Sequence, residues 1–311
     1  MAKLDKTDRI NKLRGQLMRG ADKVRYRKGL RYVVPLAKAL VGYRGSRKSH
    51  LLEAEFLGLG SHRDFVVGEG VDGAHYVIMT SDQSVGRFIY AWGSYERNQL
   101  RRAVERGAIA PGSLMLDVGA NLGTASISGL VSGWFDRAIA IEADPENARL
   151  IRTNVALNNL DEKMSVISAA AGRAAGTVSF AVDTMRRGNS KVSSDGQGIS
   201  VPVVSLAGVL ADRGIDPGEV GLVWVDVEGF EAEVIAGAGE LWEKASWVLE
   251  LRSETADLQE IGRLLKGRRV LVLTEHERPA DRKLSTAEIE AMATGRAGEI
   301  GYDVLVLPLG S

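Results

Sequence analysis

Short runs of apolar residues recur along the chain from residue 114 onward, and the clearest of them end at or beside an acidic residue. They cover residues 114–118, 138–142, 222–226 and 246–251. Their length suits β-strands that are buried on both faces. Between them, apolar residues recur at helical spacing, as with Leu150, Ile151 and Val155. The alternation predicts an α/β fold with a mostly parallel sheet covered by helices on both faces.

Further strands are expected at 164–168, 269–273 and 302–307, the last two closing the sheet. Residues 176–180 and 199–204 read as a hairpin-like excursion. The polar stretch between them, 185–198, is long enough to be a lid or binding loop, although a plain surface loop would look the same.

The region before the first sheet strand is expected to be small and mixed. Residues 65–67, 75–79 and 87–90 read as short strands with glycine-containing turns between them. Ser94 is expected to cap a helix from about Tyr95 to Arg106.

The first fifty residues form a separate compositional zone. They hold 15 lysines and arginines against 3 aspartates, a net charge of 15 − 3 = +12 in a chain whose total is zero. We predict three parts: a basic helical extension (1–50), a small β/helix region (51–110) and the main α/β domain (111–311). The extension is expected to be solvated or packed on the acidic body. Peripheral contact with an anionic membrane and a part in a homodimer are the alternatives.

Composition excludes several classes of function and of site. Forty basic and forty acidic residues balance, which argues against nucleic-acid binding over the whole surface. The chain has no cysteine, so it has no disulfide or thiolate site. We find no apolar run of roughly 18 residues that could span a bilayer and no signal peptide. These features predict a cytoplasmic protein without a transmembrane segment.

The turn after the first strand is the strongest sign of a ligand site. Asp117 ends the strand, Gly119 and Gly123 follow, and Glu142 ends the next strand about twenty residues later, the spacing at which an acid meets ribose hydroxyls. A dinucleotide fingerprint would need glycine where Asn121 and Thr124 stand. The turn therefore suits a nucleoside with an amino-acid arm, such as S-adenosylmethionine, whose ammonium group Asp117 would hold directly or through water.

Three motifs resemble one enzyme family. Residues 117–123 (DVGANLG), 141–145 (IEADP) and 224–231 (WVDVEGFE) look like the FkbM-type S-adenosylmethionine-dependent methyltransferases. The third motif makes the resemblance specific, and the likeness runs from about Phe88 to about Leu251. It implies the class I methyltransferase (Rossmann-like) fold, with seven strands of which the last is antiparallel. It also implies methylation of hydroxyls on sugars or secondary metabolites.

Candidate site residues follow from the motifs and the strand ends. The cofactor set is Glu96, Asp117, Gly119, Asn121, Gly123, Glu142, Ala143, Ala170 and Asp226, and the substrate set is Tyr95, Arg187, Asn189 and Ser190. Small residues near Ala170 would leave room for an adenine ring. The resemblance places Tyr95 and Glu96 near the cofactor or the substrate mouth. Alternatively, Glu96 only favours the start of a helix.

Asp226 and Glu228 are the candidate catalytic residues. A base that takes the acceptor proton would speed transfer by about 10²–10⁴. Alternatively, Glu228 only caps the next helix. No metal is expected, because the two acids have no clear third ligand unless Glu250 comes close. His62 and His75 are the least unlikely other bases.

We therefore predict an S-adenosylmethionine-dependent O-methyltransferase acting on a small-molecule or glycan acceptor. One rival is a nicotinamide-dependent oxidoreductase, which the missing glycines argue against. The other is a non-catalytic nucleoside-binding scaffold of the same fold, which would not need acids at three successive strand ends.

Overall fold

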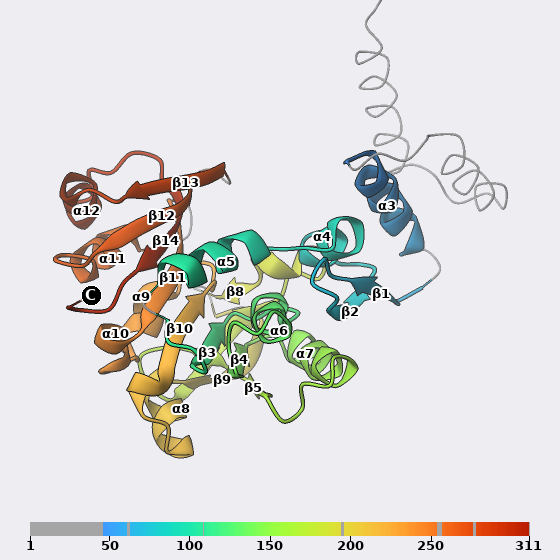
Figure 1. The fold of residues 1–311 in the computed structure, drawn as a ribbon, viewed down its shortest axis with the longest axis horizontal. Helices are drawn as coiled ribbons and strands as arrows, with labels where there is room; N and C mark the ends of the chain where they lie inside the picture. Colours follow the sequence, from blue (N-terminus) through green and yellow to red (C-terminus); the bar gives the residue numbers. More distant parts are fainter. Residues whose placement is uncertain are drawn as a thin grey trace, which may run out of the picture.

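An eight-stranded mixed sheet lies at the centre of the molecule. A computed structural model describes residues 46–60, 63–107, 109–193, 196–253, 257–275 and 278–310. The strand order is β13-β12-β14-β11-β10-β3-β4-β5 (Figure 1). The strands are β3 (Leu114–Val118), β4 (Arg137–Glu142), β5 (Met164–Ser168), β10 (Val220–Val225), β11 (Ser246–Arg252), β12 (Val270–Glu275), β13 (Arg278–Lys283) and β14 (Gly301–Val306).

The sheet has one strand more than the resemblance implied. Strands β5, β4, β3, β10 and β11 are parallel, and β14 runs antiparallel to both β11 and β12. The additional strand is β13, which pairs antiparallel with β12 at the edge. Its sequence, RPADRK, has no apolar run because an edge strand can carry charges and a proline. The apolar pattern could not reveal it.

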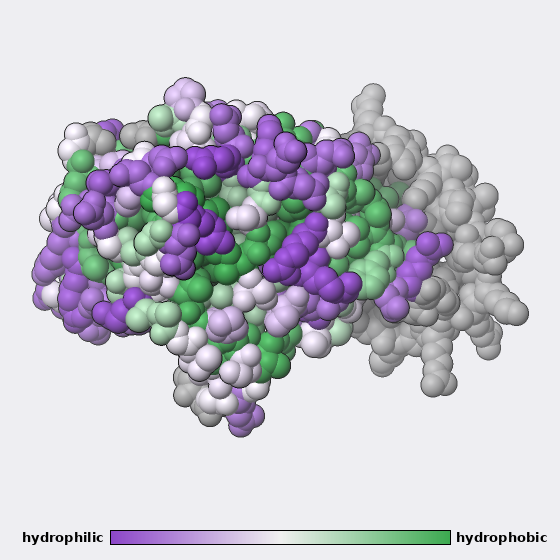
Figure 2. All heavy atoms as spheres, turned by 90° about the horizontal axis from the view of Figure 1, so that it is seen from below, coloured by the Kyte–Doolittle hydropathy of each residue, from purple (hydrophilic) through white to green (hydrophobic). Residues whose placement is uncertain are grey.

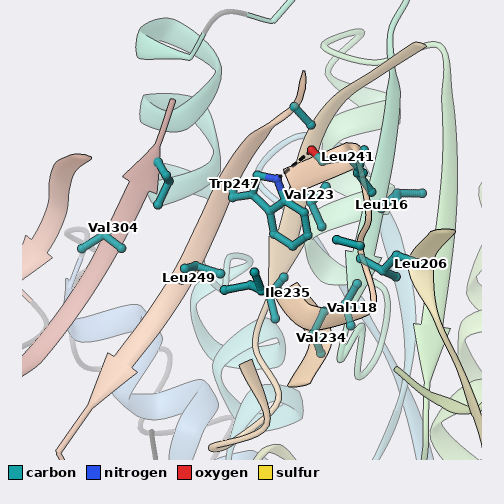
Figure 3. Packing of buried hydrophobic residues seen from close by; sticks show 14 of the residues in the cluster. Leu116, Val118, Leu206, Val223, Val234, Ile235, Leu241, Trp247, Leu249 and Val304 are labelled. Atoms are coloured by element: carbon teal, nitrogen blue, oxygen red, sulfur yellow. Dashed lines mark hydrogen bonds between the residues drawn. The ribbon is translucent and has the colours of Figure 1, made fainter. Parts of the chain in front are cut away.

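Helices cover both faces of the sheet, each over its own hydrophobic core. One face packs against α8 (Leu206–Arg213), α9 (Glu231–Ala236), α10 (Leu241–Lys244), α11 (Leu258–Leu264) and α12 (Thr286–Ala293). The other packs against α5 (Arg97–Arg106), α6 (Thr124–Val131) and α7 (Pro145–Leu157), and α4 (Val85–Trp92) contributes Val85 and Ile89 to the same core. In the first core, fully buried Trp247 donates from its indole nitrogen to the Leu241 carbonyl at 3.3 Å (Figure 3).

A small hairpin unit precedes the sheet. Strands β1 (Phe65–Glu69) and β2 (His75–Met79) pair antiparallel and lie with α3 (Ser46–Leu59) and α4 at the end of the molecule away from β12 and β13 (Figure 1). The predicted strand at 87–90 is wrong, because these residues belong to α4. Buried Ile89 packs over Gly68, where a Cβ would lie 3.3 Å from it.

Other boundaries also differ from the sequence-based expectations. Helix α5 begins at Arg97 instead of Tyr95. The predicted boundary at residue 50 lies inside α3. The basic stretch up to residue 45, His62 and His276 lie outside the described residues.

The predicted excursion after β5 is confirmed. Strands β7 (Gly176–Ala181) and β9 (Ile199–Val204) pair antiparallel within a second sheet of order β6-β9-β7-β8, with β6 (Ala170–Ala171) and β8 (Lys191–Val192). Residues 183–190, which we call the strap, connect β7 to β8 and contain the short 3₁₀ helix Arg187–Asn189.

The described surface is mixed in character. Figure 2 shows hydrophilic and hydrophobic residues intermixed across the face that it draws. Large exposed apolar side chains gather in the hairpin unit, at Phe65, Val67, Val71, Phe88 and Trp92. Among the described helices, none combines the length and apolar character needed to cross a bilayer.

Candidate functional site

One cavity collects almost all of the predicted site residues. It opens at the carboxyl ends of β3, β4, β10 and β11 and, with its open mouth, contains about 980 Å³ of empty space. The predicted residues that line it are Tyr95, Glu96, Asp117, Gly119, Asn121, Glu142, Ala143, Ala170, Arg187, Asn189, Ser190, Asp226 and Glu228. Gly123 is not among the lining residues and precedes α6 with a φ of 76°.

The turn at Gly119 draws three strand ends together. Gly119 donates to the Ile141 carbonyl at 2.9 Å, and the Asp226 amide donates to the Val118 carbonyl at 3.0 Å. The φ of Gly119 is 81°, and a Cβ there would lie 1.7 Å from the backbone oxygen of Asp226. Only glycine allows the backbone to pass this close.

Asp117 faces the cavity from the end of β3. The residue is 1% exposed, and its Oδ2 accepts a hydrogen bond from the Ser126 amide at 3.1 Å. Ser126 lies in the first turn of α6, where the helix dipole favours a carboxylate. Burial is the larger effect and raises the pKa of Asp117 to about 6. Asp117 is therefore mainly ionised at neutral pH and can accept from a cationic donor.

Glu142 holds two loops in place. Its Oε2 accepts from the Asn121 amide and its Oε1 from the Asp144 amide, both at 2.7 Å. Burial raises the pKa of Glu142 to about 8. Near neutral pH Glu142 is then mainly protonated, and a protonated carboxyl group offers one O–H donor together with its acceptor positions. It can therefore both donate to and accept from the hydroxyl groups of a ligand.

The strap is fastened to the cavity wall by a buried ion pair. Arg187, predicted to bind substrate, pairs through Nη1 with Asp144. Asp144 also accepts from the Glu146 amide and so caps α7. Ser190, another predicted substrate residue, accepts from the Asp183 amide at 3.0 Å. The described contacts of Arg187 and Ser190 thus hold the strap, and the remaining Arg187 Nε is buried without a partner.

A second group of acids lies on the β10 and β11 side of the cavity. Carboxylate oxygens of Asp226, Glu228 and Glu250 lie within 4.8 Å of one another. Arg252 Nη2 contacts Glu250 at 2.5 Å and Asp303 at 3.4 Å. Burial, reinforced by neighbouring acids, raises the pKa of Asp226 and of Glu96 well above their usual values. Glu250, which the sequence suggests only as a third metal ligand, repeats the pattern of an apolar run that ends in an acid.

Three carboxylates at this spacing have the oxygen chemistry that a divalent cation prefers. Arg252 already supplies a positive charge to Glu250, and we assign no metal ligands here. The absence of a metal stays a prediction, and a titration described below tests it.

Sequence reasoning missed several apolar and small lining residues. Ser84 and Val85 come from the start of α4, which the pattern presented as a strand. Phe180 and Val192 come from β7 and β8, and Phe230 precedes α9. Nothing in their local sequence marks them as site residues, because only the packing of distant segments brings them to the cavity.

Backbone strain is concentrated at this cavity. Among the described non-glycine residues with positive φ, three line it: Glu96 (58°), Asn121 (54°) and Glu228 (50°). Asparagine tolerates this conformation, whereas glutamate does so at a cost of about 1–2 kcal/mol. Such strain commonly persists where a site needs a particular side-chain position.

Glu228→Gly is expected to raise the free energy of unfolding by up to about 1.5 kcal/mol. The relieved strain of about 1–2 kcal/mol exceeds the backbone entropy cost of glycine, about 0.5–1 kcal/mol. Glu228→Ala is the matched control, because it removes the carboxylate and keeps the strain. Urea denaturation compares the two, and an alanine variant more stable than the glycine variant would contradict the argument.

Comparison with known proteins agrees with the motifs. A family model described as the methyltransferase FkbM domain matches residues 117–273. No curated protein matches the chain.

Three solved structures match part of this chain. The FkbM methyltransferase of Methylobacillus flagellatus KT is 15% identical over 68% of this chain and 48% of that one, with a TM-score of 0.42. P. horikoshii TYW2, solved in complex with MeSAdo, is 16% identical over 83% of this chain and 81% of that one, also with a TM-score of 0.42. The precorrin-6y C5,15-methyltransferase of Geobacter metallireducens GS-15 is 15% identical over 67% and 87%, with a TM-score of 0.38. The chain thus spans about half the length of the Methylobacillus protein.

Proposed function

Because the chain belongs to the FkbM methyltransferase family, we propose that it transfers a methyl group from S-adenosylmethionine to a hydroxyl group of a small-molecule or glycan acceptor. The observation that carries the proposal is the Gly119 turn, which joins the acids Asp117 and Glu142 in one cavity. Family membership also weighs against the nicotinamide-dependent alternative.

The lining residues fit the proposed cofactor. Glu142 would hold the ribose hydroxyls and Asp117 the ammonium group, while Ala143 and Ala170 leave room for the flat base. Asn121 Oδ1 and Arg187 Nε are buried without hydrogen-bond partners, so a ligand there would meet unsatisfied polar atoms. When bound, S-adenosylmethionine supplies a methyl group already activated on a sulfonium.

The protein then has to orient the acceptor and take up its proton. Asp226 and Glu228 line the cavity together with Tyr95 and Phe230. We assign the role of proton acceptor to the carboxyl groups of Asp226 and Glu228. Orientation can lower a barrier by roughly 7–11 kcal/mol, and a positioned base adds about 10²–10⁴ in rate. A methyl-transfer assay with labelled cofactor and fractionated lysate would identify the acceptor and would separate an enzyme from a scaffold.

The remaining expectations stay predictions. They are a cytoplasmic location, no nucleic-acid partner, a possible homodimer and possible membrane contact through the basic N-terminal stretch.

Asp117→Asn is expected to weaken S-adenosylmethionine binding about 10- to 100-fold, because a charge-assisted hydrogen bond contributes roughly 1.5–3 kcal/mol. In the wild type, affinity should fall as the pH drops through about 6, where Asp117 becomes protonated. Calorimetric titration measures both effects. Asp161→Asn, on an exposed loop, is the control. Unchanged affinity in both Asp117→Asn and Glu142→Ala would show that the site assignment is wrong.

A further inference from the structure

We propose that Asp226 and Glu250 share one proton in the cofactor-free cavity and release it when a cationic cofactor binds, so that the base for transfer forms only in the loaded protein. This proposal rests on the proposed function. It adds Glu250 as a second carboxylate of the base, and it names the positive charge of the cofactor as the cause of proton release.

Sheet register places the two acids side by side. Strands β10 and β11 are parallel, and Val225 pairs with Leu249. The next residue of each strand is the acid, so both carboxyls project from the same edge of the sheet. Their oxygens lie within 4.8 Å, and both residues line the cavity. Two carboxylates this close repel, and one of them is expected to keep a proton unless a cation arrives.

The groups around the pair add more negative charge than positive charge. The acids that act on it are Glu96 before α5, Glu228 and Glu231 at the start of α9, and Asp303 on β14. Among the described residues, the cations that act on this cluster are Arg252 on β11 and Lys191 on β8, the latter through Glu228. Arg252 is shared between Glu250 and Asp303, so it cannot neutralise the pair.

The effects of burial and of neighbouring charges agree with this geometry. Burial raises the pKa of Glu250 to about 7, although Arg252 acts in the opposite direction. Burial and then Glu250 itself raise the pKa of Asp226 well above its usual range. Near neutral pH the pair therefore holds a proton while the cavity lacks a positive charge.

A bound sulfonium would supply that charge. The pair then gives one proton to solvent as one positive charge enters, so the net charge of the cavity is unchanged. The deprotonated oxygens of Asp226 and Glu250 can next accept the acceptor's hydroxyl proton. Arg252 acts as a positioning residue, because it holds Glu250 at the edge of the sheet and favours its ionised form.

Calorimetry with two cofactor forms tests the proposal on the full-length protein. Titrations near pH 6.5 in two buffers of different ionisation enthalpy count the protons released on binding. S-adenosylmethionine should release about 0.5–1 proton more than S-adenosylhomocysteine, as expected for one acid titrating near its pKa. Both ligands share the ribose and the ammonium group, so the difference isolates the sulfonium charge. Sinefungin, which carries an amine in place of the sulfonium, should behave like S-adenosylmethionine.

Substitutions test whether the released proton comes from Asp226 and Glu250. Glu250→Gln and Asp226→Asn should each lose the difference between the two cofactors while still binding S-adenosylhomocysteine, which shows that the cavity is folded. Glu240→Gln, at an exposed ion pair, should retain it. Arg252→Met should move half-maximal release upward by about 1 pH unit or more, because a nearby cation lowers the pKa of an acid by about 1–3. Arg252→Lys should restore it.

Several outcomes would overturn the proposal. Equal proton release by both cofactors would do so, as would loss of the difference in Glu96→Gln but not in Glu250→Gln. Binding that requires added Mg²⁺ or Mn²⁺ and disappears with EDTA would make the cluster a metal site instead. If neither cofactor binds, the proposed function itself fails, whereas binding with equal release removes only this inference.

Discussion

Gly119→Ala is expected to abolish cofactor binding and to lower the free energy of unfolding by about 3 kcal/mol. The new methyl group would lie 1.7 Å from the backbone oxygen of Asp226, and a backbone atom cannot move aside as a flexible side chain can. The end of β10 would have to separate from the turn, carrying Asp226 with it. The positive φ of 81° adds strain for any residue with a Cβ.

Gly133→Ala separates the close contact from the effect of φ. Gly133 has a φ of 69°, and a Cβ there would meet nothing within 4 Å. This control should lose only about 1–2 kcal/mol and should bind S-adenosylhomocysteine normally. Urea denaturation and calorimetric titration measure the two quantities. Equal losses in both variants would mean that the approach of Gly119 to Asp226 is not what holds the strand ends together.

Arg187→Met is expected to lower the free energy of unfolding by about 3–5 kcal/mol, the usual loss when one partner of a buried ion pair is removed. Arg187 is 9% exposed and Asp144 2% exposed, so the remaining carboxylate would have little water to replace its partner. The strap would lose its attachment to the wall of the cavity, and cofactor affinity should fall with it.

Arg186→Met provides the matched comparison for the strap. Arg186 precedes Arg187 and is exposed, so its loss should change stability by less than about 0.5 kcal/mol. Denaturant unfolding gives the stability, and limited proteolysis within residues 183–190 reports whether the strap has loosened. If both variants are equally stable and equally resistant, the ion pair does not hold the strap.

The strand-end acids could be predicted because local sequence carries their signal. Each follows a buried apolar run, and parallel strands bring their carboxyl ends to one edge of the sheet. By contrast, β13 has no apolar run to reveal it. Residues 87–90 belong to α4, whose Ile89 packs over Gly68 on β1, a contact that the local pattern does not contain.

Other features depend on contacts between distant residues. The pairing of Arg187 with Asp144 joins residues 43 positions apart, so the charged strap suggested a ligand contact instead. The neighbours of Glu250 follow from the register of β11 with β14, which places it opposite Asp303. The left-handed backbone of Glu96 and Glu228 is imposed by the fold, and no local pattern announces it.

Asn154 on α7 links the hairpin unit to the glycine turn that lines the cavity. Its Oδ1 accepts from the Val77 amide at 2.7 Å, and its Nδ2 donates to the Leu122 carbonyl at 3.1 Å, so one amide group spans β2 and the glycine turn. A fragment starting at residue 111 would leave that amide half satisfied and would uncover the core beneath Ile78 and Leu100. Truncation or domain exchange at this point would therefore cut through a single cooperative unit.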